Sequence, residues 1–176
     1  GTVITYLDAE GNPIIRSGGY STIVRTLVGG MASDDFYYDL NGQPVQCSGG
    51  YYGIHREYNS DGQNTSLTFL DKDGHAVCTS SGYASKTYQR DGNGTVVGEQ
   101  YFDTEGNSAR SSLGQYGELY QHNEQGYISQ ITYLDLDGNP APTNAGYTIL
   151  KRTYHRDGTA DTDMYFDADG NLKALS

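Results

Sequence analysis

The chain has 176 residues, of which 35% are apolar, with 24 glycines, 17 tyrosines, no tryptophan and a net charge of −11. The negative charge argues against nucleic acid and acidic membranes as partners, because both are bound through Lys and Arg. No apolar run is long enough to predict a membrane span. The apolar fraction is low for a globular chain, but the aromatic residues are too many and too regularly placed for disorder. We therefore expect units that bury themselves against their neighbours.

One motif recurs from end to end: an aromatic residue, an Asp two positions later, and a Gly three positions after the Asp. Its aspartates lie 31, 32, 32, 32 and 32 residues apart, at Asp8, Asp39, Asp71, Asp103, Asp135 and Asp167. A near-constant period of this kind indicates a tandem repeat. We predict one tandem-repeat domain over 1–176, cut from a longer protein and holding about five and a half repeats. Its parts are 2–33, 34–65, 66–97, 98–128, 129–161 and a terminal hairpin at 162–176.

Each repeat is expected to fold as β-hairpins. Asp-x-x-Gly between aromatic and β-branched runs is typical of a tight turn, which we call the first turn. The stretch "GYTILKRTY" (146–154) alternates as a strand does, and "RDG" then turns the chain back into "TDMYFD". We expect three short strands and two turns per repeat. The predicted fold is all-β: an elongated, open, solenoid-like array of stacked antiparallel hairpins, with end-to-end self-association through its edge strands. A closed propeller is the alternative, although its blades are longer.

Fourteen of the tyrosines fall in three columns of the repeat. The hairpin column, two residues before each first-turn Asp, contains Tyr6, Tyr37, Phe69, Tyr101, Tyr133 and Tyr165. The glycine-tyrosine column contains Tyr20, Tyr51, Tyr83, Tyr116 and Tyr147, and a third contains Tyr58, Tyr88, Tyr120 and Tyr154. Neighbouring strand residues face opposite sides. We therefore expect the hairpin tyrosines to face outward. The more apolar residue directly after each hairpin-column residue should face the core: Leu7, Tyr38, Leu70, Phe102, Leu134 and Phe166.

The segments "DMYFDADGNL" (163–172), "EQYFDTEGNS" (99–108) and "DFYYDLNGQP" (35–44) resemble the aromatic hairpins of Gram-positive cell-wall-binding repeats. These are choline-binding and glucan-binding modules. The present chain differs from them in lacking Trp and in its longer period. The resemblance implies a non-catalytic module that binds a saccharide or cell-wall glycopolymer, located outside the cell or at its surface. By this analogy the ligand would stack on Tyr37, Tyr101, Tyr133, Tyr165, Tyr51, Tyr83 and Tyr147.

Two other functions stay open from the residues themselves. A spacer or protein-interaction scaffold would bury most of the tyrosines. Calcium-stapled repeats are a weaker alternative: eleven acidic residues lie in the first turns, but Gly146 stands where a calcium loop starting at Asp135 needs a bidentate Glu.

We predict no enzyme activity, no cofactor and no metal site. The four histidines do not share a repeat position, and none accompanies a nucleophile motif. Cys47 and Cys78 lie in neighbouring repeats, and both free thiols and a disulfide remain open.

Overall fold

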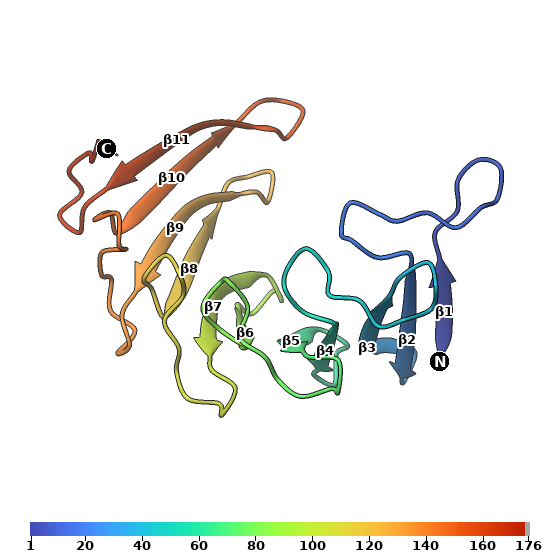
Figure 1. Cartoon of the computed structure of the whole chain (residues 1–176). Helices are drawn as coiled ribbons and strands as arrows, with labels where there is room; N and C mark the ends of the chain where they lie inside the picture. The colour runs from blue at the N-terminus through green and yellow to red at the C-terminus, as the bar shows by residue number, and fades with distance from the viewer. Residues whose placement is uncertain (175–176) are drawn as a thin grey trace. The chain divides into compact units, whose positions relative to one another are not determined.

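The computed structural model describes residues 1–174 and is all-β (Figure 1). Eleven antiparallel strands form one sheet whose strand order is the sequence order, β1 to β11. The sheet is open, because within the described residues β1 and β11 each have a single neighbour. No helix in this part of the chain is long and apolar enough to cross a membrane. These features confirm the prediction of an open all-β array of antiparallel hairpins.

The chain forms two compact units. Unit 1 comprises 1–87 and 102–107, and unit 2 comprises 88–101 and 108–176. Strands that start in unit 1 are β1 Thr2–Thr5, β2 Thr22–Val28, β3 Met31–Tyr38, β4 Gly53–Tyr58, β5 Asn64–Leu70 and β6 Ser85–Arg90. Strands that start in unit 2 are β7 Val96–Phe102, β8 Gly117–His122, β9 Ile128–Leu134, β10 Ile149–Tyr154 and β11 Ala160–Phe166.

The repeat is visible as five hairpins, β2–β3, β4–β5, β6–β7, β8–β9 and β10–β11, whose first strands begin 31 or 32 residues apart. The predicted edges between repeats fall at or inside the second strand of a hairpin; the edge between 33 and 34, for example, lies in β3. The structural repeat is therefore a hairpin whose boundaries do not coincide with the repeat boundaries predicted from the sequence. Whether the chain is one domain stays a prediction.

Each repeat contains three tight turns rather than the two expected. In the first and third turns, and in the second turns at 59–62, 91–94, 123–126 and 155–158, an N–H donates to the carbonyl three residues earlier, at 2.8–3.2 Å. The second turn joins the two strands of a hairpin, and the third turn ends at the glycine-tyrosine column, as in 16–20 and 143–147. The expected third strand is reduced to a single bridge after the first turn, such as Tyr38 to Pro44. The predicted count of three strands is therefore wrong, because a third turn interrupts that segment.

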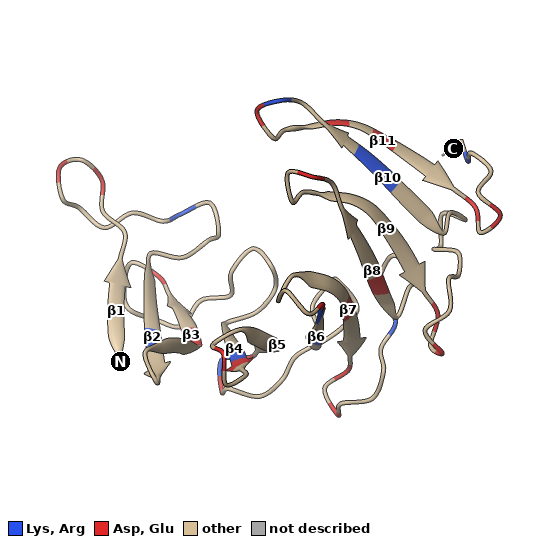
Figure 2. Ribbon diagram, turned by 180° about the vertical axis from the view of Figure 1, so that it is seen from behind, with Lys and Arg blue, Asp and Glu red and all other residues tan. Residues whose placement is uncertain are grey.

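The first turns are held by their aspartates. In all six, Asp Oδ1 accepts hydrogen bonds from the backbone N–H groups two and four residues later, at 2.8–3.0 Å. The Gly three residues after the Asp has a positive φ, for example 87° at Gly11, which a residue with a Cβ rarely adopts. Figure 2 marks Asp and Glu positions in red along the ribbon, several of them in the turns. The Asp-x-x-Gly motif is thus a structural motif of the turn.

Third turns of adjacent repeats stack through the backbone. In unit 1, Ser48 N–H donates to Gly18 O, and in unit 2, Asn144 N–H donates to Leu113 O, both at 2.8 Å. The segment after each first turn thereby folds back over one face of the strands. In unit 1 this segment contributes Cys47 and Val45 to a cluster with Ile23 and Tyr37. The core therefore lies between the strands and the stacked third turns.

Candidate functional site

The two tyrosine columns predicted to bind a ligand pack against each other. In unit 1 they alternate along a ladder of rings whose centroids are 4.6–6.1 Å apart: Tyr6, Tyr20, Tyr37, Tyr51, Phe69 and Tyr83. In unit 2, Tyr147 packs against Tyr133 at 5.4 Å and Tyr165 at 4.6 Å. Such spacings are those of favourable aromatic pairs. We call this arrangement the aromatic ladder; it is part of the protein core.

The aromatic ladder leaves little ring surface for a ligand. Tyr37, Tyr101, Tyr133 and Tyr147 are only 4–6% exposed. The remaining predicted residues, Tyr51, Tyr83 and Tyr165, are half-buried. Glycan stacking on these seven residues stays a prediction, but a binding surface of free ring faces has to come from other aromatic residues.

The predicted facing of the strands is only partly correct. Leu70 and Leu134 are buried as expected, but Leu7 is 54% exposed. The hairpin tyrosines Tyr37, Tyr101 and Tyr133, expected to face outward, are buried as well. The physical reason is the third turn: the segment that ends in Tyr51 covers the face that carries Tyr37. The two-residue period separates the faces of a strand but does not say which face a distant turn will cover.

The ladder position in the fourth repeat is occupied by Gln115, not by Tyr116 as the sequence alignment suggested. The third turn there closes from Ser111 N–H to Gln115 O, as Thr143 N–H does to Tyr147 O. Gln115 is buried and donates from Nε2 to Glu118, which also accepts from the Tyr120 hydroxyl, both at 2.8 Å. Counting from the Asp would have placed Gln115 correctly.

Burial changes the acidity of the ladder phenols. It raises the pKa values of Tyr37 and Tyr133 above the ordinary value. For Tyr51, burial together with the adjacent Cys47 thiol raises the pKa to about 12. These phenols stay neutral at physiological pH, as core residues do. Cys47 and Cys78 are free cysteines in the structure, which leaves no disulfide between them.

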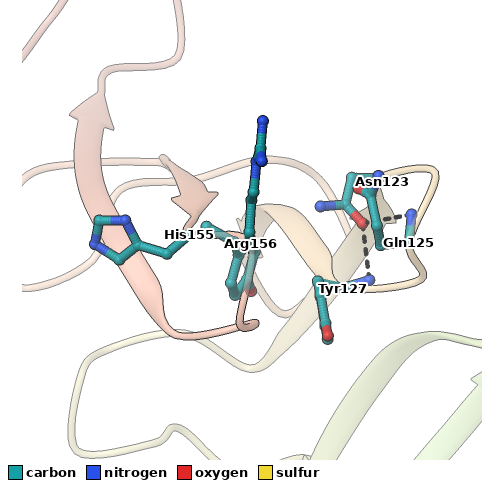
Figure 3. A pocket seen from close by; sticks show the side chains of 6 residues that line it. Asn123, Gln125, Tyr127, His155 and Arg156 are labelled. Carbon is teal, nitrogen blue, oxygen red and sulfur yellow. Dashed lines mark hydrogen bonds between the residues drawn. The ribbon is translucent and has the colours of Figure 1, made fainter.

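A groove in unit 2 lies between the second turns of β8–β9 and β10–β11 (Figure 3). Its volume is about 460 Å³, and we call it the tip groove. It is lined by Asn123, Gln125 and Tyr127 from one turn and by Tyr154, His155 and Arg156 from the other. Tyr127 is 42% exposed, the most of any tyrosine in the part of the chain that the structure describes. The tip groove thus combines an accessible aromatic ring with polar side chains.

Tyr127 and Tyr154 form the aromatic wall of the tip groove. Their centroids are 4.9 Å apart with an interplanar angle of 32°. The Tyr154 hydroxyl donates to Ile128 O at 2.6 Å, which ties β10 to the preceding hairpin. Tyr127 crosses in the opposite direction: a Cβ on Gly158 would be 2.6 Å from its hydroxyl oxygen. Each tyrosine therefore contacts the backbone of the opposite hairpin, and these two contacts hold the pair in place.

The polar side of the tip groove offers hydrogen-bond donors. Asn123 Oδ1 accepts from the N–H groups of Gln125 and Tyr127, at 3.1 and 3.0 Å, as Figure 3 shows. This leaves the Asn123 amide N–H₂, the exposed Gln125 side chain and the exposed Arg156 guanidinium for a ligand. His155 points away from the other labelled side chains and lies 3.4 Å from Asp161. The arrangement is suited to reversible binding of a hydroxyl-rich molecule.

A related groove lies beside the first two hairpins of unit 1, and two of its lining residues have the repeat positions of the tip-groove tyrosines. Tyr58 has the repeat position of Tyr154, and its hydroxyl likewise donates to a carbonyl 26 residues earlier, Ala32 O, at 2.8 Å. Met31 has the position of Tyr127, with its sulfur 3.4 Å from where a Cβ on Gly62 would be. This groove has a volume of about 370 Å³. Both units therefore have a groove beside the recurring hydroxyl-to-carbonyl bond, but the unit 1 groove carries Met31 at the position of Tyr127 and is otherwise lined by strand residues such as His55, Arg56 and Glu57.

Sequence reasoning missed the tip groove because Tyr127 lies outside the three tyrosine columns. Its departure from the columns was the available signal: a tyrosine that is not needed in the repeated core is free to serve a surface. As for metals, the described residues include no group of three His, Cys, Asp or Glu side chains placed to hold an ion. In the first turns the aspartate Oδ1 atoms are already used by backbone N–H groups.

Comparison with known proteins adds no family. No protein-family model matches the chain, and no curated protein matches it. The likeness to cell-wall-binding repeats therefore rests on the hairpin motifs themselves. Function has to be argued from the geometry of the tip groove.

Proposed function

We propose that the chain is a non-catalytic, multivalent carbohydrate-binding repeat module whose ligands occupy grooves between adjacent hairpin tips. The observation that carries this proposal is the pair of exposed Tyr127 and half-buried Tyr154 beside the polar groups of the tip groove. An aromatic face supports the C–H face of a pyranose ring, while neighbouring amide and guanidinium groups bind its hydroxyls. Sites of this kind are concave and place a few polar groups around an apolar surface.

The net charge of −11 favours an uncharged glycan. A long polyanion would be repelled by the many acidic turns, despite the local positive charge of Arg156. A single shallow groove binds weakly, so useful affinity would come from several grooves engaging one polymer. The resemblance to cell-wall-binding repeats supports a saccharide or cell-wall glycopolymer as the partner, and an extracellular or cell-surface location.

A spacer or protein-interaction scaffold is the second candidate. The observation that favours it is the aromatic ladder, which uses most of the predicted platform tyrosines for packing. A scaffold of this kind needs no small ligand. The two candidates differ in whether replacing Tyr127 changes anything except local packing.

Tyr127→Met tests the proposed function, because Met is the residue that the unit 1 groove carries at this position. It should pack over Gly158 as Met31 packs over Gly62, but it offers no ring face. We expect affinity for a soluble neutral oligosaccharide such as cellohexaose, laminarihexaose or chitohexaose to fall about tenfold, equivalent to about 1.4 kcal/mol. Isothermal titration or ¹H–¹⁵N chemical shifts of residues 123–127 would measure it.

Two matched variants complete the experiment. Tyr127→Phe keeps the ring and should retain binding, whereas Met31→Tyr should add a second aromatic groove in unit 1 and raise the number of bound ligands. Thermal melts should show that each variant remains folded. If wild-type protein binds none of these oligosaccharides, or binds one equally well after Tyr127→Met, the tip groove is not the carbohydrate site.

A further inference from the structure

Unit 1 has a second kind of groove, at the opposite end of the β2–β3 hairpin from its second turn. Its volume is about 480 Å³, and it lies beside the first turn that follows β3. Tyr38, Leu40 and Val24 line it as apolar groups, and Asp39 and Ser21 as polar ones. It shares no residue with the tip groove. We call it the first-turn groove.

The corresponding groove of unit 2 is almost closed. It is lined by residues at the same repeat positions, Leu134, Asp135, Leu136 and Gly138, but its volume is only about 20 Å³. Tyr116 lines it at the position that Ser21 has in unit 1. The two grooves also differ at other lining positions, where Thr5, Pro13 and Thr22 of unit 1 are replaced by Gln100, Ser108 and Gly117, but the exchange of Ser21 for Tyr116 adds the most side-chain volume. The first-turn groove of unit 1 therefore lacks the six-membered phenol ring that lines the corresponding groove of unit 2.

Two polar atoms at the first-turn groove, Ser21 Oγ and Asp39 Oδ2, have no side-chain hydrogen-bond partner within the described residues. Ser21 is 1% exposed, and its Oγ has no hydrogen-bond partner within the described residues, which is a costly state for a buried hydroxyl. Asp39 Oδ1 holds the first turn. In three other first turns an Asn donates to the aspartate Oδ2, whereas Gln43 stands at that position here and no such bond forms.

We infer that the first-turn groove of unit 1 binds one uncharged pyranose ring. Its C–H face would lie against Tyr38, Val24 and Leu40, one hydroxyl would donate to Asp39 Oδ2, and another would partner Ser21 at the floor. The carboxylate excludes anionic sugars by repulsion. This inference shares the ligand class of the proposed function and extends it to a second, separate site. The two sites can fail independently because they have no residue in common.

Chemical-shift titration of ¹⁵N-labelled full chain with methyl β-D-glucopyranoside, methyl β-D-galactopyranoside and N-acetylglucosamine tests the inference. We expect at least one sugar to shift the backbone amides of residues 21–22 and 38–42 with saturation in the millimolar range. Ser21→Tyr should abolish these shifts by filling the groove as Tyr116 does. Ser21→Ala, which removes only the hydroxyl, should weaken binding about fivefold.

Tyr116→Ser is the reciprocal variant: it should open the unit 2 groove and produce new sugar-dependent shifts near Asp135. Tyr127→Met should leave the shifts of the first-turn groove unchanged, which separates this site from the tip groove. Thermal melts establish that Ser21→Tyr is folded. Absence of shifts at 21–22 and 38–42 with all three sugars would overturn the inference, as would shifts that persist in folded Ser21→Tyr. Binding of p-cresol in place of the sugars would also overturn it, because the groove would then select a phenol.

Discussion

Charged residues inside this acidic protein are strongly paired. Asp35 has a side chain only 3% exposed, and it accepts from Arg25 at 2.7 and 2.8 Å and from Arg56 at 3.1 Å. Burial alone would raise the pKa of Asp35, but the two arginines outweigh it and lower the pKa. Because the pKa in the folded state is below that of the unfolded chain, this contribution to stability is complete at neutral pH and is lost as the pH falls into the acid range.

Unit 2 contains the equivalent pair in a more exposed form, which gives a matched comparison. Arg152 donates to Asp163 at 2.6 and 2.7 Å, without a second arginine. Asp35→Asn leaves two arginines without their buried anion and should lower the free energy of unfolding by about 3 kcal/mol. Asp163→Asn should cost about 1 kcal/mol or less. Urea denaturation measures both free energies of unfolding. An equal loss of stability in the two variants would show that the burial of Asp35 does not determine how much its ion pairs stabilise the fold.

At the residue scale, the sequence identified which positions repeat but not what each one does. The period places Tyr37, Tyr101 and Tyr133 at one repeat position, yet their environment depends on a turn that follows each hairpin in the chain. Tyr127 stands out only as a tyrosine outside the columns, and Ser21 lies at a repeat position whose residue varies, so the pattern gives it no role. That the tip-groove residues line a common groove becomes visible only when the positions of adjacent hairpins are known.

At the element scale, the hairpin and its turns follow directly from the sequence. Asp, two variable residues and Gly encode a turn, and Asn performs the same function in second turns: Asn59 Oδ1 and Asn123 Oδ1 accept the same two N–H bonds as the first-turn aspartates. The third turn was not predicted, although Gly19, Gly50 and Gly82 precede tyrosines at a fixed spacing. Its first residue varies, from Arg16 to Thr143, so no polar motif marks its start.

Substitution of Asp135 tests how the first turn is held. Asp135→Ala removes the acceptor of two backbone bonds and should lower the melting temperature by about 2–4 °C, equivalent to about 1 kcal/mol. Asp135→Asn keeps an oxygen at the Oδ1 position and should melt close to wild type, as the natural Asn turns suggest. Differential scanning calorimetry would resolve the two. An Asn variant as unstable as the Ala variant would mean that charge, not the acceptor geometry, matters.

In the whole molecule, repeated and non-repeated positions have different roles. The repeated columns build the aromatic ladder and the turns, and residues outside the columns vary the grooves between hairpins. The period and the all-β class were predictable because they are written locally in every repeat. The grooves were not, because each is assembled from segments distant in the sequence and its lining includes residues that vary between repeats, such as Tyr127 against Met31 and Tyr116 against Ser21.

The tyrosines are divided between a covered aromatic ladder and an open groove, and their differing accessibility is directly measurable. Nitration of the folded chain with tetranitromethane, followed by peptide mass spectrometry, measures this residue by residue. We predict that Tyr127, at 42% exposure, is modified first, and that Tyr37, Tyr101 and Tyr133, at 6%, 4% and 4%, react only after unfolding. Nitration of these three at the rate of Tyr127 in protein that retains its native circular dichroism would contradict the account.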